Sequence, residues 1–171
     1  MVCVDESGIV AGGRVSYGYA ARGERCEEHA PYRKGRRTSL IGWVGLGRGG
    51  VVAVEGSVSG DLFERFVREH LCPNLRRGDT VVWDNHSVHK RPALRALIEA
   101  RGAELVWQPR YSPEVNAAEE LWSKVKHLVK RARADTQTAL VAALAAAVAA
   151  LTWEDSHGWL RHAGYRLSPI E

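Results

Sequence analysis

The segment that decides the fold class is Thr80-Val81-Val82-Trp83-Asp84-Asn85, an apolar run that ends abruptly on two polar residues. A strand that is apolar on both sides is expected in a sheet whose two faces are both covered. Such sheets are typical of α/β proteins, in which helices pack on the faces of the sheet. The segment therefore predicts a central strand of an α/β domain, with Asp84 at the end of that strand.

Further strands are expected on both sides of this segment in the sequence. A short β-prone run at 2–4 ends in the turn-forming cluster Asp5-Glu6-Ser7-Gly8. Other β-prone runs occupy residues 14–21, 38–46, 51–54 and 105–107. Because the first runs follow one another directly and the later ones alternate with helices, the order predicts a mixed sheet of about five strands.

Helices are expected to flank this sheet. Ser59 can cap a helix whose apolar residues recur at helical spacing as far as Leu71. Pro92 suits the first turn of a second helix. A third helix is expected over about 117–133, and an Ala-rich helix follows it.

Length and composition bound the class of protein. The chain has 171 residues, of which 45% are hydrophobic and 26% are charged, so we expect one globular domain. Its core is expected over about 2–133, with a helical extension over 135–171. The longest apolar stretch, 139–151, is too short for a bilayer span of about 20 residues. Three scattered cysteines suggest neither disulfides nor zinc, which favours a cytoplasmic location. The net charge of +4 favours polyanionic partners.

Three carboxylates lie where such a sheet could gather them at one edge. Asp5 follows the first expected strand, Asp84 follows the central strand, and Glu119 lies in the first turn of the third helix. Ligands of α/β sheets commonly bind at strand ends, and Mg²⁺ prefers oxygen ligands. Two such ions could cleave a phosphodiester. Each residue taken alone also fits an ordinary turn or helix start.

These residues lie in three motifs that resemble the mariner-type superfamily of DDE transposases, specifically its bacterial insertion-sequence branch. The motifs are VDESG at 4–8, VWDNHSVHK at 82–90 and QPRYSPEVNAAE at 108–119, continuing to Trp122 and Lys126. The 34 residues from 85 to 118 are the spacing typical of that branch. The resemblance implies an RNase H-like fold and metal-dependent DNA cleavage and strand transfer. It makes Asp5, Asp84 and Glu119 the catalytic ligands of a two-metal Mg²⁺ or Mn²⁺ site.

Two positions depart from the pattern of that family. Ala117-Ala118 replaces the usual Pro-Ile, and Gln108 replaces the usual Leu. Loss of the proline removes a preset first helical turn, which we expect to loosen the placement of Glu119. Glu120 is a rival third ligand, but it lies about 100° around the helix from Glu119. Spacing and motif both favour Glu119.

Polar neighbours of the carboxylates are candidates for supporting roles. Asn85, His86 and His89 are expected to orient the metal ligands or contact phosphate, with a plain polar turn as the alternative. Asn116 is expected to cap the helix that carries Glu119. Basic residues near the site are candidates for binding the DNA backbone, with a solvated surface as the alternative. They are Lys124, Lys126, Lys130, Arg131, Arg33, Lys34, Arg36 and Arg37.

The leading hypothesis is the catalytic domain of an insertion-sequence transposase. The resemblance implies element terminal repeats and target DNA as substrates, and a homo-oligomer on DNA near the nucleoid. We expect no N-terminal helix-turn-helix domain in this chain, so a separately encoded one is a further expectation. No membrane partner is expected. Two alternatives remain: a decayed or repurposed DNA-binding remnant, and an RNase H-like nuclease that cuts RNA in hybrids.

Overall fold

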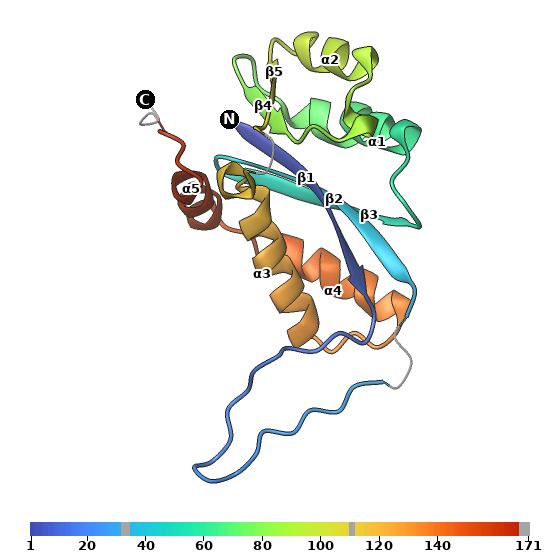
Figure 1. Cartoon of the computed structure of the whole chain (residues 1–171), viewed down its shortest axis with the longest axis vertical. Helices are drawn as coiled ribbons and strands as arrows, with labels where there is room; N and C mark the ends of the chain where they lie inside the picture. The colour runs from blue at the N-terminus through green and yellow to red at the C-terminus, as the bar shows by residue number, and fades with distance from the viewer. Residues whose placement is uncertain (32–34, 110–111, 168–171) are drawn as a thin grey trace.

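A computed structural model of the chain describes residues 1–31, 35–109 and 112–167. They form a mixed β-sheet with helices on both faces (Figure 1). The strands are β1 (Val2–Val10), β2 (Arg37–Gly45), β3 (Arg48–Glu55), β4 (Thr80–Trp83) and β5 (Glu104–Trp107). The α-helices are α1 (Gly60–Phe66), α2 (Pro92–Glu99), α3 (Ala118–Arg131), α4 (Gln137–Ala149) and α5 (Trp153–His162). A π-helical turn, Val67–Leu71, continues α1.

The order of strands across the sheet is β3-β2-β1-β4-β5. The first three strands pair antiparallel, whereas β1 with β4 and β4 with β5 pair parallel. Parallel neighbours need a crossover connection, which α1 and α2 supply. The mixed five-stranded sheet expected from the sequence is therefore confirmed.

Two apolar layers hold the helices on the sheet. On one face, Phe63 of α1 packs its ring edge-on against Trp83 of β4, with ring centres 5.4 Å apart. On the other face, Leu121 and Val125 of α3 join Leu140 of α4 over β1 and β2. These residues are fully buried, so burial of apolar surface on both faces is the main force that fixes the architecture.

The first strand is longer than the sequence predicts. The turn expected at 5–8 is wrong, because β1 continues through it to Val10. Each residue of β1 is paired with a residue of β2, from Val2 opposite Gly45 to Val10 opposite Arg37. This pairing overrides the local turn preference. Asp5 consequently lies inside a strand of nine residues rather than after a short one.

The strand expected at 14–21 is also wrong. The described part of the chain between β1 and β2 contains no strand or helix, and it extends away from the body as a long loop (Figure 1). The side chains of Tyr17 and Tyr19 are almost fully exposed. Since β1 pairs with β2 on one side and with β4 on the other, residues 14–21 have no place beside the strand that they follow.

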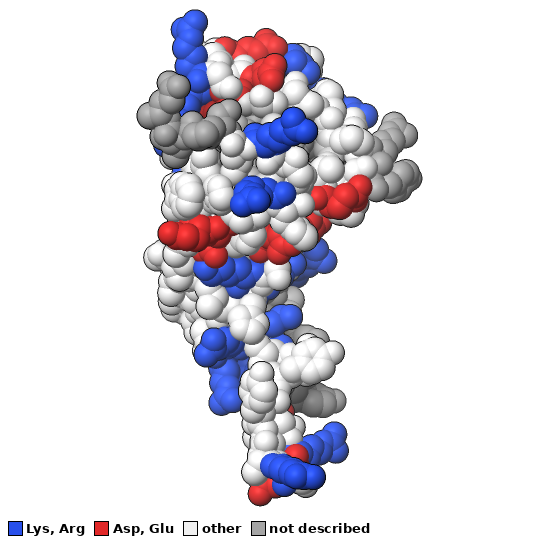
Figure 2. All heavy atoms as spheres, turned by 90° about the vertical axis from the view of Figure 1, so that its left-hand side faces the viewer, with Lys and Arg blue, Asp and Glu red and all other residues white. Residues whose placement is uncertain are grey.

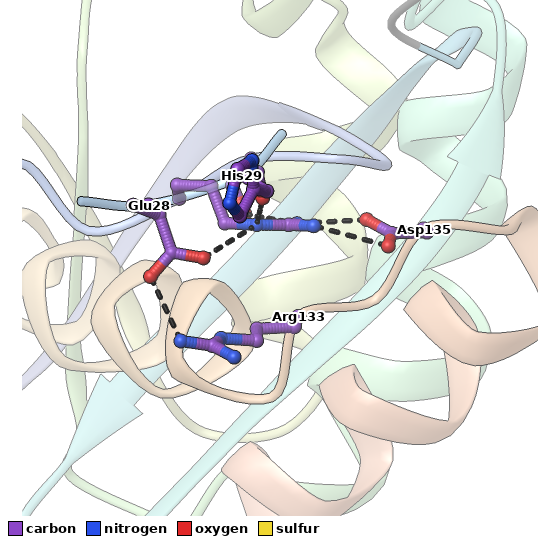
Figure 3. A network of polar contacts seen from close by, with 6 residues as sticks. Glu28, His29, Arg133 and Asp135 are labelled. Atoms are coloured by element: carbon purple, nitrogen blue, oxygen red, sulfur yellow. Dashed lines mark hydrogen bonds and ion pairs between the residues drawn. The ribbon is translucent and has the colours of Figure 1, made fainter. Parts of the chain in front are cut away.

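A polar network anchors the base of this loop to the connection between α3 and α4 (Figure 3). The guanidinium of Arg14 pairs with the carboxylate of Asp135 at 2.7 Å and with that of Glu28 at 3.2 Å. It also donates to the carbonyl oxygen of His29. Arg133 pairs with Glu28 at 2.9 Å. Both ends of the loop are thus tied to the helical layer.

The helices after α3 pack onto the sheet as well. Leu140 and Leu144 of α4 and Leu160 of α5 are buried in the apolar layers. Among the described residues, no single helix is long and apolar enough to cross a membrane. The pair α4 and α5 meets that test together, but the two helices are bent by 82°.

Candidate active site

Asp5, Asp84 and Glu119 come from three different elements and line one cavity of about 500 Å³. Asp5 lies in β1, Asp84 directly follows β4, and Glu119 lies in the first turn of α3. The parallel register aligns Cys3 with Val82, and continuing it by two residues brings Asp5 level with Asp84. Neighbouring strands lie about 4.8 Å apart. The fold therefore gathers the three carboxylates where β4 ends, beside the middle of β1.

The carboxylates share a cavity without converging on a single point. Within residues 1–31, 35–109 and 112–167, no group of three or more His, Cys, Asp or Glu side chains is close enough to hold a metal ion. The same cavity is lined by Asn85, His86, Gln108 and Asn116. Its walls are therefore rich in oxygen and nitrogen atoms.

Asp5 is the most perturbed of the three acids. Burial raises the pKa of its carboxyl group, and the negative charge of Glu119 raises it further. A hydrogen bond from Nε1 of Trp122 to Oδ2 of Asp5, 3.0 Å long, offsets part of this effect. The resulting pKa is about 7. The ionised form of Asp5 thus lacks compensating positive charge, a condition that a bound cation would relieve.

Trp122 has a role that the sequence did not reveal, because its N–H group holds the carboxylate of Asp5. Its ring is 2% exposed and packs over Gly42 of β2, where a Cβ atom would lie 2.4 Å from the ring. A buried tryptophan usually needs a partner for its N–H group. That rule predicts a partner for the N–H group of Trp122, but it does not identify Asp5, which is 117 residues away in the sequence.

Replacing Trp122 by Phe is expected to lower stability by about 1.5–3 kcal/mol, because the ionised carboxylate of Asp5 loses its donor. The loss should be larger at pH 8.5 than at pH 5.5, where Asp5 is protonated. Chemical denaturation at both pH values in EDTA measures it. The matched control is Trp43→Phe, which removes the same atoms from another buried tryptophan. A loss of equal size at the two pH values would contradict the assigned hydrogen bond.

Asp84 is held by two donors. Its Oδ1 accepts a hydrogen bond from the backbone N–H of His86 at 2.8 Å and lies 2.7 Å from Nδ1 of His89. The hydrogen bond from His89 lowers the pKa of Asp84 and outweighs the effect of burial. Asp84 therefore carries a negative charge at neutral pH.

His89 bridges two carboxylates from neighbouring strands. Its Nε2 lies 2.8 Å from Oε1 of Glu6 in β1, while its Nδ1 faces Asp84. The ring is 1% exposed and stacks near Phe63, with ring centres 4.3 Å apart. Burial alone would lower the pKa of His89, but the hydrogen bonds to Asp84 and Glu6 raise it to about 9. Sequence reasoning did not single out Glu6, which is 83 residues from His89.

The start of α3 is fixed without the family's proline. Oδ1 of Asn116 accepts the N–H of Ala118 at 3.1 Å, and its carbonyl oxygen accepts the N–H of Glu119 at 3.0 Å. The hydroxyl of Tyr165 donates to the carbonyl oxygen of Val115 at 2.6 Å. These contacts position Glu119 by local hydrogen bonds.

Glu120, the alternative third ligand, points elsewhere. Its Oε1 lies 3.5 Å from Nε2 of His162 in α5, and Glu120 does not line the carboxylate cavity. Ala117 and Ala118 are fully buried against Leu160 of α5, which keeps this end of the helix in place. Of the two neighbouring glutamates, Glu119 is therefore the one that lines the carboxylate cavity.

The residues between β4 and β5 complete the cavity wall. Nδ2 of Asn85 donates to the carbonyl oxygen of Gln108 at 2.8 Å. The side chain of Gln108 is buried, and its Nε2 donates to the carbonyl oxygen of Ser112. Oε1 of Gln108 has no hydrogen-bond partner among the described residues. Oxygen atoms of this kind are the ligands that hard divalent cations prefer.

The basic residues singled out from the sequence do not form one cluster. Arg37, Lys126 and Lys130 line a second cavity. Lys124 instead forms an ion pair with Asp155 of α5. Arg36 and Arg131 are exposed outside that cavity. Arg33 and Lys34 lie outside the described residues, as do Arg110 and Tyr111 of the third motif.

Comparison with known proteins identifies the family. The sequence profile described as DDE superfamily endonuclease matches residues 1–141. The chain belongs to this family. Among curated proteins, none matches the sequence significantly. The DDE endonuclease membership expected from the three motifs is confirmed.

Solved structures share the fold of this DDE endonuclease domain. A pre-cleavage Mos1 transpososome matches with a TM-score of 0.68 and 19% identity, covering 95% of this chain and 51% of that chain. The catalytic domain of Mos1 mariner transposase matches with a TM-score of 0.64 and 16% identity, covering 95% of this chain and 74% of that chain. These matches confirm the RNase H-like fold. The chain spans about half the length of the transposase chain in the transpososome.

Proposed function

We propose that this DDE endonuclease domain is the catalytic domain of a transposase, which cleaves DNA and transfers the cut strand. Asp5, Asp84 and Glu119 are its catalytic residues and the ligands of divalent cations. The observation that carries the proposal is that these three carboxylates line one cavity in a chain of the DDE endonuclease family. The raised pKa of Asp5 and the unpartnered oxygen of Gln108 support a cation there.

The proposed reaction has two phosphoryl-transfer steps. Water attacks the phosphorus at the element end, the P–O3′ bond breaks, and a free 3′-hydroxyl remains. This hydroxyl then attacks a phosphorus of target DNA and displaces its O3′. Two bound Mg²⁺ or Mn²⁺ ions supply activation of the attacking oxygen and stabilisation of the leaving oxygen.

The chain's own residues orient the carboxylates for this chemistry. Trp122 holds Asp5 through Nε1, and His89 holds Asp84 through Nδ1. Asn116 sets the first turn of the helix that presents Glu119. Asn85 and His86 line the cavity at the end of β4, where they can contact a substrate phosphate. Groups that hold metal ligands in this way commonly change metal affinity when they are mutated.

The proposed partners are element ends and target DNA. The related solved structures include Mos1 transposase paired with the left transposon end, and Mos1 complexes with Mn and with Mg. We assign end recognition to a helix-turn-helix unit and expect a homo-oligomer on DNA, with contacts near the nucleoid. The bacterial insertion-sequence branch remains the proposed source of the domain, on the strength of the 34-residue spacing.

Incubation of the purified protein with supercoiled plasmid tests this proposal. We expect nicks in Mg²⁺ or Mn²⁺ and none in EDTA, because the bound ions would supply the activation of the attacking oxygen. The Asp84→Asn variant serves as the control for contaminating nuclease. DNA binding without cleavage in either metal would overturn the proposal in favour of a non-catalytic remnant. Preferential cutting of RNA in RNA–DNA hybrids would instead indicate an RNase H-like nuclease.

A further inference from the structure

A second cavity, of about 320 Å³, lies beside the same strand and helix that carry Asp5 and Glu119. One wall is the stretch Gly8, Ile9 and Val10 at the end of β1, and the opposite wall is the third and fourth turns of α3. Arg37, Lys126 and Lys130 line it, and none of the described acidic residues does. The cavity is therefore a concentration of positive charge.

These three cations have no ion-pair partner within the described residues, although Arg14 and Lys124, which lie nearby in the sequence, are paired. Lys126 and Lys130 are also half-buried, so water compensates their charges incompletely. Like charges around one small space repel each other. An anion in the cavity would offset both the incomplete hydration of the lysines and the repulsion between the like charges.

The backbone is arranged to bring the cations together. Gly8 has no side chain, and a Cβ atom there would lie 2.6 Å from Nε of Arg37. The guanidinium of Arg37 can therefore lie directly against β1. Lys126 and Lys130 are four residues apart, so their side chains share one face of α3. Two elements thus present their charges to the same cavity from different sides.

The face of α3 that carries Lys126 and Lys130 also leads from this cavity toward the carboxylates. Lys126 and Lys130 follow Glu119 by seven and eleven residues. At 1.5 Å per residue, they lie about 10 Å and about 16 Å along the helix from Glu119, on nearly the same face. Below a band of acidic residues, the charged side chains on this side of the molecule are mostly Lys and Arg, set among uncharged residues (Figure 2). A chain of phosphates could follow this path.

We propose that the cavity formed by Arg37, Lys126 and Lys130 binds one backbone phosphate of the DNA strand that enters the carboxylate site. This inference rests on the proposed function and specifies how the substrate is held. A DNA strand has one phosphate per about 3.4 Å along the duplex axis, which places the bound phosphate about three to five nucleotides from the cleaved bond. The planar guanidinium of Arg37 suits bidentate contact, and the lysines add point charges.

Salt-dependent DNA binding in EDTA tests the phosphate site without requiring catalysis. The probe is a fluorescently labelled duplex, and anisotropy gives its affinity for the full chain at several salt concentrations. Lys126→Ala is expected to weaken binding and to lower the slope of log K against log salt by less than about 1, because Arg37 and Lys130 still face the phosphate. Arg77→Ala is the control, because Arg77 is an exposed arginine outside both cavities. Its slope should equal that of the wild type.

The number of phosphates is tested by combining substitutions. Since the three cations share one phosphate, Lys126→Ala with Lys130→Ala should lower the slope by no more than about 1 in total. Lys126→Arg, which keeps the charge, should restore the wild-type slope and show that folding is not the cause. A slope that falls by about 1 with each added substitution, or that does not fall when Arg37, Lys126 and Lys130 are all replaced by Ala, would overturn the single-phosphate site. Failure of the proposed function has another signature: normal DNA binding with no cleavage in either metal.

Discussion

Replacing Asp5 by Asn is expected to abolish metal-dependent DNA cleavage and, in the same protein, to increase stability at pH 8 in the absence of metal. Asparagine keeps the shape of the side chain but lacks the charge that a cation needs. Loss of a residue that only supports a metal ligand costs about 10–100-fold in affinity or activity, so loss of the ligand itself should exceed 100-fold. Plasmid nicking in Mn²⁺ and titration of Mn²⁺ against thermal stability measure the two losses.

The gain in stability follows from the pKa of Asp5, which folding raises from 3.8 to about 7. Between these values the folded protein binds more protons than the unfolded chain, so stability falls as pH rises through this window. The total fall for this residue is at most about 4 kcal/mol, at about 1.4 kcal/mol per pH unit. The substituted asparagine does not titrate, so the variant should lose this part of the pH dependence.

Denaturation in EDTA at pH 5 and pH 8 distinguishes this effect from a general change in packing. The control is Asp61→Asn, because the side chain of Asp61 is 89% exposed and lies outside the carboxylate cavity. That variant should retain both cleavage and the wild-type pH dependence. If Asp5→Asn and wild type lost equal stability between pH 5 and pH 8, the raised pKa of Asp5 would be wrong.

Replacing His89 by Ala is expected to destabilise the protein by about 1–3 kcal/mol near pH 6, because it leaves two partly exposed carboxylates without their shared partner. Those carboxylates are Glu6, at 2.8 Å, and Asp84, at 2.7 Å. His86→Ala is the matched control, since His86 is exposed and only its backbone contacts Asp84. We expect that control to change stability by less than about 0.5 kcal/mol.

The cost of the His89 substitution should also depend on pH. Folding raises the pKa of His89 from 6.5 to about 9, so its stabilising effect is complete below about pH 6.5 and is lost as pH rises through 9. The difference between wild type and His89→Ala should therefore shrink between pH 6 and pH 10. Urea denaturation across this range measures it. A difference that stays constant with pH would show that His89 acts by packing against Phe63 alone.

Local patterns were sufficient for those elements whose signals lie within the element itself. The apolar run 80–83 is β4, and the spacing of apolar residues after Ser59 predicted a helix that ends, as observed, at Leu71, although its last turn is π-helical. The helix expected over 117–133 is α3, within two residues at each end. In each case the period of apolar residues and the capping residue lie within one short window of sequence.

Local patterns failed where a distant partner decided the outcome. Residues 5–8 have turn-forming side chains, yet they continue β1 because β2 pairs along its whole length. Residues 14–21 have β-prone side chains, yet they form an exposed loop because no described strand pairs with them. A propensity contributes only tenths of a kcal/mol per residue, which ladder pairing and burial readily exceed.

The sequence by itself predicted which carboxylates the fold brings to one cavity, because motif identity and the spacing of Asp84 and Glu119 are properties of the chain. Only the tertiary structure decided what surrounds them. Trp122 reaches Asp5 across 117 residues, and His89 reaches Glu6 across 83. Arg37 meets Lys126 at one cavity because Gly8 leaves room beside β1. Such contacts depend on sheet register and helix packing, which arise when segments far apart in the sequence bury their apolar surfaces together.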